Sequence, residues 1–252
     1  MANWTRDQLL AALNLYHSTP FGQQHKSHPP IIKLGGLIGR TPDAVAMKLS
    51  NFTSLDPIET ARGIKGLSGA SNNDREIWAE FEGRANALAE ESEAALEKFS
   101  KESGRTEKWI DARPVEGPSE RIATVKVRRQ QAFFRRSVLG SYGTRCCITG
   151  NPVPTLLRAS HIVPWAKREK ERANPSNGLC LAATFDAAFD GGLIALDDKF
   201  RVLLSDKLMS FLPNRELERS FGLIEGNPIK MPEKNLPDPK LLAWHREHVF
   251  LV

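Results

Sequence analysis

Four polar residues in the second half of the chain have types and spacings suited to chemistry at a metal ion. Asp186 and Asp190 lie four residues apart in a segment of helical character. At that spacing two side chains share one face of a helix and can converge on one hard cation. His161 lies on a predicted strand across from that face, and Asn177 lies at the loop end nearest the helix. We therefore predict a site where a strand, a loop and a helix meet.

Each of these residues taken alone also has a purely structural interpretation. A single histidine on a strand is more often a buried, hydrogen-bonded residue than a base. Two aspartates at this spacing are more often part of a solvated helix surface, and Asn177-Gly178 is a common turn sequence. Their order along the chain, inside a basic segment, favours a functional site.

Short elements are expected to position these residues. Residues 127–143 read as a helix that ends at glycines, and residues 193–204 read as a hairpin around Asp197-Asp198-Lys199. The remaining elements are a strand and turn at 146–150, a strand at 156–163, a polar loop at 167–176, a helix at 182–189 and a closing helix near 239–250.

Three sequence blocks resemble HNH nucleases, the ββα-metal class: ASHIVPW, NPSNGLCL and FDAAFDGGLI. The resemblance covers roughly residues 127–204. It implies that His161 is a general base, that Asn177 orients the site, and that Asp186 and Asp190 bind a divalent cation. The implied reaction is hydrolysis of a DNA phosphodiester bond.

Two positions depart from the pattern of that family. Aspartate stands in the third block where the family name implies histidine, and carboxylates suit Mg²⁺ or Mn²⁺ rather than zinc. Ser160 precedes the histidine, where an acidic or histidine ligand is often found. Its hydroxyl is a weaker metal ligand, so the number of ligands stays open.

Residues from about 3 to 57 read as three helices. Thr5 and Thr41 are suited to cap the first and third helices, and Gly39 to end the second. The stretch LIGRTPDAVAMKLSNF resembles the turn and recognition helix of homeodomain-like and Myb-like modules. We therefore predict a helix-turn-helix domain at 1–62, and the alternative is a generic three-helix bundle. The residues expected to contact DNA are Arg40, Lys48 and Asn51.

Residues 63–117 are expected to connect this domain to a nuclease domain at 118–252. They begin with a glycine-rich stretch, continue as one long helix over 72–103, and end in a proline-containing linker. The predicted fold class is α+β, with a ββα-metal domain behind an all-helical DNA-binding domain and a long connecting helix.

Charge is unevenly distributed along a chain of net charge +5. Basic residues dominate 118–175 and acidic residues dominate 74–107, so the basic segment suits a polyanion or forms a solvated basic face. The residues expected to contact DNA phosphates there are Arg128, Arg129, Arg135, Arg136, Arg158, Lys167 and Arg168.

The cysteines and the apolar runs exclude some classes of protein. Cys146, Cys147 and Cys180 lack the spacing of a zinc ribbon and are expected to be buried thiols. No apolar run approaches the roughly 20 residues of a membrane span, and the first residues lack signal-peptide features. A cytoplasmic protein is expected.

The predicted function is that of a restriction endonuclease acting on double-stranded DNA. Whether it requires a modified base stays open. One such site cuts one strand, so a homodimer is expected. The string LLAWHREHVF resembles the C-terminal end of restriction-type HNH proteins. The alternatives are a homing or nicking endonuclease, a cytotoxic nuclease, and a DNA-binding regulator with an inactive HNH fold. The DNA target and cleavage pattern stay open.

Overall fold

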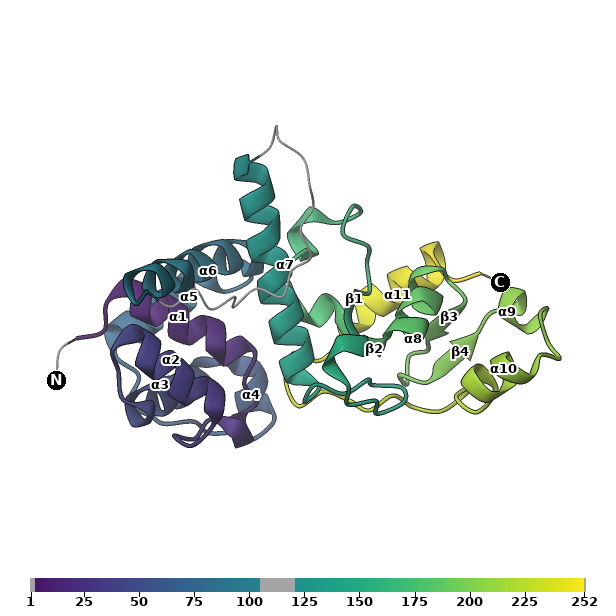
Figure 1. The fold of residues 1–252 in the computed structure, drawn as a ribbon. Coiled ribbons are helices and arrows are strands. Elements are labelled where there is room, and N and C mark those ends of the chain that lie inside the picture. Colours follow the sequence, from purple (N-terminus) through teal and green to yellow (C-terminus); the bar gives the residue numbers. More distant parts are fainter. Residues whose placement is uncertain (1–2, 105–120, 252) are drawn as a thin grey trace. The chain divides into compact units, whose positions relative to one another are not determined.

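The computed structural model describes residues 3–104 and 121–251, and the chain forms two compact units, residues 1–136 and 137–252 (Figure 1). We call them the N-terminal and C-terminal units. The N-terminal unit is helical and contains α1 Arg6–His17, η1 Phe21–Gln23, α2 Pro29–Ile38, α3 Pro42–Leu55, α4 Pro57–Ala61, α5 Asn72–Phe81, α6 Ala85–Glu102 and most of α7 Arg121–Ser141.

The first three helices confirm the prediction from local sequence signals. Thr5 and Gln8 form a capping box at the start of α1, and the Thr41 side chain accepts a hydrogen bond from the Ala44 amide at the start of α3. Gly39 ends α2 in the left-handed conformation, with φ of 68°. The helices bury Tyr16 and other large side chains in a shared core.

The prediction of one long helix over residues 72–103 is wrong. Helix α5 ends at Phe81, Gly83 has φ of +67°, and α6 begins at Ala85. Helix α6 packs against α1, and α5 packs against α3. The turn lets the apolar faces of both helices join the core of the N-terminal unit, so this segment is part of that unit and not only a connection to the next domain. The predicted boundary at 117/118 lies outside the described residues.

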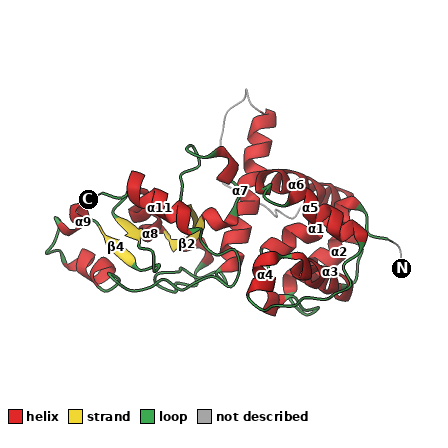
Figure 2. Ribbon diagram, turned by 180° about the vertical axis from the view of Figure 1, so that it is seen from behind, coloured by secondary structure: helices red, strands yellow, loops and turns green. Residues whose placement is uncertain are grey.

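The C-terminal unit has two small antiparallel sheets. Strand β1 (Leu157–His161) pairs with β2 (Gly178–Ala182), and β3 (Ile194–Leu196) pairs with β4 (Val202–Leu204). Helix α8 (Ala183–Asp190) follows β2 directly and packs on β1 and β2 (Figure 2). Strand β1 and helix α8 confirm the prediction, whereas β2 was not predicted, because the stretch after Asn177 was expected to lead directly into the helix. The other elements are η2 Pro154–Leu156, η3 Glu169–Glu171, η4 Pro175–Asn177, α9 Asp206–Met209, α10 Arg215–Leu217, η5 Glu218–Gly222 and α11 Pro239–His248.

The segment Cys146–Gly150 is a turn rather than the expected strand. The Gly150 amide donates to the Cys146 carbonyl, and the Cys147 amide donates to the Cys180 carbonyl at 2.8 Å. A single backbone contact to β2 attaches the turn to the sheet without forming a ladder. The three thiols are buried and form no disulfide.

The closing helix expected near residues 239–250 is present as α11, and it packs against β3 and the end of α8. The His245 ring stacks on Phe189 with 3.8 Å between the ring centroids. Gly192, with φ of +70°, lies against the Val249 carbonyl, and a Cβ atom there would approach that oxygen to 2.0 Å. Only glycine therefore permits this close approach. Within 3–104 and 121–251, no helix has the length and apolar character needed to cross a membrane.

Candidate active site

The ββα elements bring four of the predicted catalytic and metal-binding residues to one pocket of about 420 Å³. Strand β1 contributes Ser160 and His161, and α8 contributes Asp186 and Asp190. Because α8 packs on β1, the two aspartates one helical turn apart face the end of that strand. The pocket is also lined by Arg158, Ala159, Pro164 and Trp165.

His161 is held by a backbone carbonyl. Its Nε2 lies 2.9 Å from the Arg172 oxygen, and since a carbonyl only accepts, Nε2 carries the proton. In the neutral ring, Nδ1 is then the basic nitrogen. Burial lowers the pKa of His161, and the Arg172 carbonyl opposes that shift. The imidazole is therefore kept in its neutral, proton-accepting form at lower pH than an exposed histidine.

Asn177 does not line the pocket, and its buried side chain organises the loop between β1 and β2. Its Oδ1 accepts from the Val163 amide at 2.8 Å. Its Nδ2 donates to the carbonyls of Val163 at 3.1 Å and Glu171 at 3.2 Å. These bonds fix the residue next to the carbonyl that holds His161. This geometry gives the amide an orienting task.

The two aspartates share an environment that disfavours charge in the absence of a cation. Desolvation raises the pKa of Asp186, while Ser160 and Arg158 lower it. Asp190 is exposed on one side, yet desolvation and then the neighbouring Asp186 charge raise its pKa to about 6. Two carboxylates that repel one another are relieved by binding a cation between them.

Ser160 supplies an independent observation on whether these residues fit a cation. Its hydroxyl is buried and makes no hydrogen bond of normal geometry with any described residue. It nevertheless lies close enough to both aspartates to lower the pKa of each. A buried, unsatisfied oxygen beside two carboxylates is the set of hard donors that a divalent cation prefers.

The described side chains offer few ligands to a divalent cation at this site. In the described part of the chain, no group of three or more His, Cys, Asp or Glu side chains is placed to hold a metal ion. Asp186 and Asp190 with the Ser160 hydroxyl fit Mg²⁺, which keeps several waters and often uses one or two carboxylates. They do not fit a structural zinc site.

Arg158 contributes a positively charged side chain to this pocket. Its Nη1 donates to the carbonyls of Thr155 at 3.2 Å and Leu157 at 3.0 Å, which anchors the side chain beside Asp186. The other two basic residues predicted nearby, Lys167 and Arg168, are exposed on the loop after β1. Arg168 lies 5.7 Å from the centroid of the Trp244 ring.

The basic residues of α7 are only partly available, contrary to expectation. Arg129 forms a bidentate ion pair with Glu97, in which its Nε and Nη2 donate to the two carboxylate oxygens at 3.1 and 2.7 Å. Arg136 pairs with the buried Glu93. The acidic helix α6 therefore neutralises part of the basic segment. Two other arginines on this helix, Arg128 and Arg135, are half-buried.

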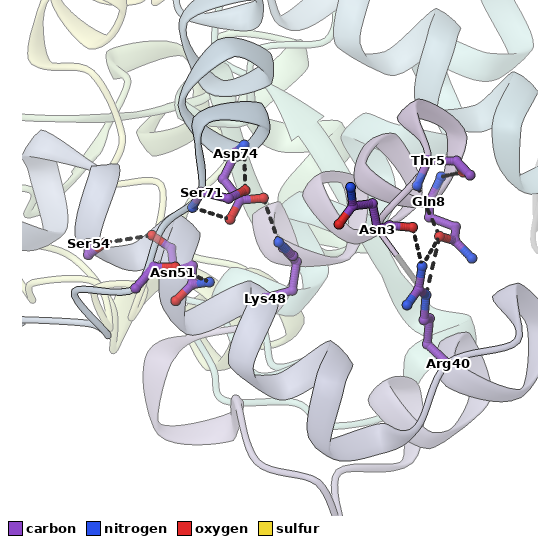
Figure 3. A network of polar contacts seen from close by, with 10 residues as sticks. Asn3, Thr5, Gln8, Arg40, Lys48, Asn51, Ser54, Ser71 and Asp74 are labelled. Carbon is purple, nitrogen blue, oxygen red and sulfur yellow. Dashed lines mark hydrogen bonds and ion pairs between the residues drawn. The ribbon is translucent and has the colours of Figure 1, made fainter. Parts of the chain in front are cut away.

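The predicted DNA contacts of α3 are engaged within the N-terminal unit (Figure 3). Lys48 is buried and pairs with the fully buried Asp74 at 2.6 Å, so its expected availability to DNA is wrong. Arg40 donates to Gln8 and to the Asn3 carbonyl. Asn51 donates to the Gly69 carbonyl at 3.3 Å. The reason is that α5, expected to be part of one long connecting helix, supplies the partner of Lys48.

Sequence reasoning missed two contributors to the site. Trp165 lines the pocket with its ring edge-on to His161, the centroids 5.5 Å apart. Arg172 supplies the carbonyl that His161 contacts. The Pro-Trp pair directly after the histidine strand is a visible signal for the first. Nothing in the sequence singles out the second, because its main chain does the work.

The comparisons with known proteins address the same segment. No curated protein matches the chain. Residues 146–197 match the family model described as HNH endonuclease, and they contain β1, β2, α8 and every residue of the pocket. This segment of the chain is therefore similar to the HNH endonuclease family, which supports a nuclease domain.

Proposed function

We propose that the chain is a divalent-metal-dependent DNA endonuclease and that the pocket between β1 and α8 is its active site. The observation that carries the proposal is the placement of a neutral His161, with Nδ1 as its basic nitrogen, in one pocket with two carboxylates and an unsatisfied serine hydroxyl. HNH nucleases use divalent cations, and the donors here favour Mg²⁺ or Mn²⁺.

Each residue then has a defined task in phosphodiester hydrolysis. His161 accepts a proton at Nδ1 from the attacking water, and the Arg172 carbonyl holds the tautomer that leaves Nδ1 basic. Asp186 and Asp190, with Ser160, would hold the cation. When bound, the cation supplies Lewis-acid stabilisation of charge on the phosphate and the leaving oxygen. Arg158 binds a phosphate oxygen, and Asn177 orients the loop.

We further propose a role in restriction, including restriction of modified DNA. The support is the joining of a separate helical unit to a nuclease-like unit. In this role the N-terminal unit selects double-stranded DNA, and two copies of the chain act together to cut both strands. The exposed Lys167 and Arg168 contact phosphates, and so do Arg128 and Arg135 of α7.

The test is cleavage of plasmid DNA, unmodified or carrying methylated adenine or cytosine, with Mg²⁺, Mn²⁺ or a chelator. We expect metal-dependent cutting that falls by about 100- to 10,000-fold in His161→Ala. His248→Ala, a change at an exposed histidine of the same unit, is the matched control. A linear product indicates paired copies, whereas a nicked circle indicates a single-strand cutter. The substrate preference tests the restriction role.

A second candidate function is a DNA-binding regulator with an inactive HNH fold. The short set of protein ligands around Asp186 and Asp190 favours it, since the described residues offer no third acidic, histidine or cysteine ligand. DNA binding without cleavage under every metal condition would support this alternative. Cleavage that survives His161→Ala unchanged would reject the proposed mechanism.

A further inference from the structure

One wall of the pocket has no role in the proposed hydrolysis of a phosphodiester bond. Pro164 and Trp165 line it beside the charged groups and follow His161 by three and four residues. Hydrolysis at a phosphate requires the base, the carboxylates and Arg158, all of them polar. An aromatic wall next to them is suited to the uncharged part of a nucleotide, since every base presents a flat π-face.

Trp165 is not a core residue, unlike its neighbours in sequence. Ile162 and Val163 are 0% and 1% exposed and belong to the core of the C-terminal unit. Trp165 is half-buried, and its exposed part borders the pocket. A large apolar ring left partly in water costs free energy that a ligand can recover by covering it.

The ring is also held in place before any ligand arrives. The Arg172 guanidinium lies 5.2 Å from the Trp165 ring centroid. The Arg172 Nε donates to the Trp165 carbonyl at 3.1 Å, and its Nη1 pairs with Glu169 at 3.3 Å. The His161 ring meets the indole at 88°. An aromatic surface fixed on two sides loses little conformational entropy when it binds a ligand.

We propose that Trp165 stacks on the base of a nucleotide flanking the scissile phosphate and so positions the DNA strand in front of His161. The inference rests on the proposed nuclease function and adds a contact with the substrate. It makes Trp165 a substrate-binding residue, and it makes the Arg172 side chain the support of that ring. The contact tolerates any base sequence, because stacking does not read base edges.

The test combines changes in the protein with changes in the DNA. A short duplex with a mapped cleavage position is prepared with a single abasic site at each nucleotide around that position. For the wild-type chain with Mg²⁺, we expect an abasic site at one flanking position to slow cleavage roughly tenfold, the scale of base–aromatic stacking. Trp165→Leu should cut intact DNA about tenfold more slowly and no longer respond to that abasic site. Trp165→Phe should keep most of the discrimination.

Two further arms separate failure of this inference from failure of the nuclease proposal. Affinity of the wild-type chain, in chelator, for labelled duplexes that carry one abasic site at each nucleotide in turn measures the contact without cleavage and without a mapped position, and Trp165→Leu should remove the abasic effect on Kd. Trp244→Leu, a change at a tryptophan outside the pocket, should leave the discrimination intact. If the abasic penalty is the same with and without Trp165, in both cleavage and affinity, the stacking contact does not exist. If nothing is cut but the affinity penalty depends on Trp165, the contact stands and the proposed reaction fails.

Discussion

His161 and Asn177 donate hydrogen bonds to the carbonyl groups of two consecutive residues. The His161 Nε2 contacts the Arg172 oxygen at 2.9 Å, and the Asn177 Nδ2 contacts the Glu171 oxygen at 3.2 Å. The two predicted site residues are thus joined through one short stretch of main chain. Asn177 fixes the carbonyl next to the one that sets the tautomer of His161, which gives it an effect on the base without touching the pocket.

We therefore expect Asn177→Ala to impair both stability and activity. The change leaves the buried Val163 amide and carbonyl without the partner that Asn177 supplies, and the Glu171 carbonyl keeps only its bond from the Asn174 amide. Each such group costs about 1 to 3 kcal/mol, and partial relaxation brings the expected loss in free energy of unfolding to about 2 to 4 kcal/mol. Urea unfolding followed by circular dichroism measures it.

Cleavage by Asn177→Ala should be measured without denaturant, at a temperature where the variant is folded. We expect a lower kcat there, because the turn that holds His161 is no longer fixed. The matched control is Asn227→Ala, since Asn227 is exposed and donates to a single carbonyl. A folded Asn177→Ala chain with wild-type kcat would show that the amide has no orienting role.

The aspartate pair predicts opposite effects of one substitution with and without metal. Asp190→Asn removes a negative charge that repels Asp186 in the folded state, so the metal-free variant should be slightly more stable than the wild type. With Mg²⁺ at about 100 times its Kd, the wild type should gain about 2.7 kcal/mol by mass action, and the variant much less. Thermal unfolding with Mg²⁺ or a chelator measures both differences.

Asp206→Asn, at an exposed aspartate of α9, is the control for the loss of one negative charge. It should respond to Mg²⁺ as the wild type does. Equal stabilisation of Asp190→Asn and wild type by Mg²⁺ would mean that Asp190 is not a ligand.

Local signals in the sequence were enough to predict much of the site. The spacing of Asp186 and Asp190 places them on one helix face, and the apolar run around His161 predicts the strand that carries it, although β2 was not predicted. The caps at Thr5 and Thr41 likewise act over three residues. Each of these signals depends only on residues within about one helical turn of one another, so it can be recognised in the sequence alone.

Features that depend on distant partners could not be predicted. Lys48 has the sequence position of an exposed recognition-helix residue, and only the return of α5 places Asp74 against it. That return depends on Gly83, whose left-handed conformation breaks a segment rich in helix formers. The contact of Arg172 with His161 could likewise not be predicted, because Arg172 makes it through its carbonyl oxygen.

A pH dependence of stability is expected from His245. Burial lowers the pKa of this histidine to about 4 from an ordinary value of 6.5, and its Nδ1 has no hydrogen-bond partner among the described residues. The native state therefore resists protonation that the unfolded chain accepts. This contribution to stability is complete above pH 6.5 and is lost as the pH falls from 6.5 to 4. The loss amounts to about 3 kcal/mol.

His245→Phe should flatten that dependence, because phenylalanine keeps a ring against Phe189 and has no group to protonate. The free energy of unfolding is measured by urea titration at pH 7 and pH 4.5 for both chains. His248→Phe is the control, since that histidine is exposed. An identical fall in stability for wild type and His245→Phe would contradict the assignment to His245.

The buried pair of Lys48 and Asp74 decides between packing and DNA recognition for α3. Lys48→Met leaves the Asp74 carboxylate fully buried without its cation, and the expected cost is about 3 to 5 kcal/mol in free energy of unfolding. Lys48→Met combined with Asp74→Asn removes both charges and should recover more than half of that loss. Lys26→Met, at an exposed lysine, should change stability by less than about 0.5 kcal/mol.

DNA affinity of the same folded variants completes the argument. If Lys48 serves the core of the N-terminal unit, the double variant binds DNA as tightly as the wild type, with the same salt dependence. A phosphate contact by Lys48 would instead weaken binding on all sequences and reduce the slope of log K against log salt by about 1. That second outcome, with stability unchanged in Lys48→Met, would restore α3 as a recognition helix and require the pair with Asp74 to open on DNA.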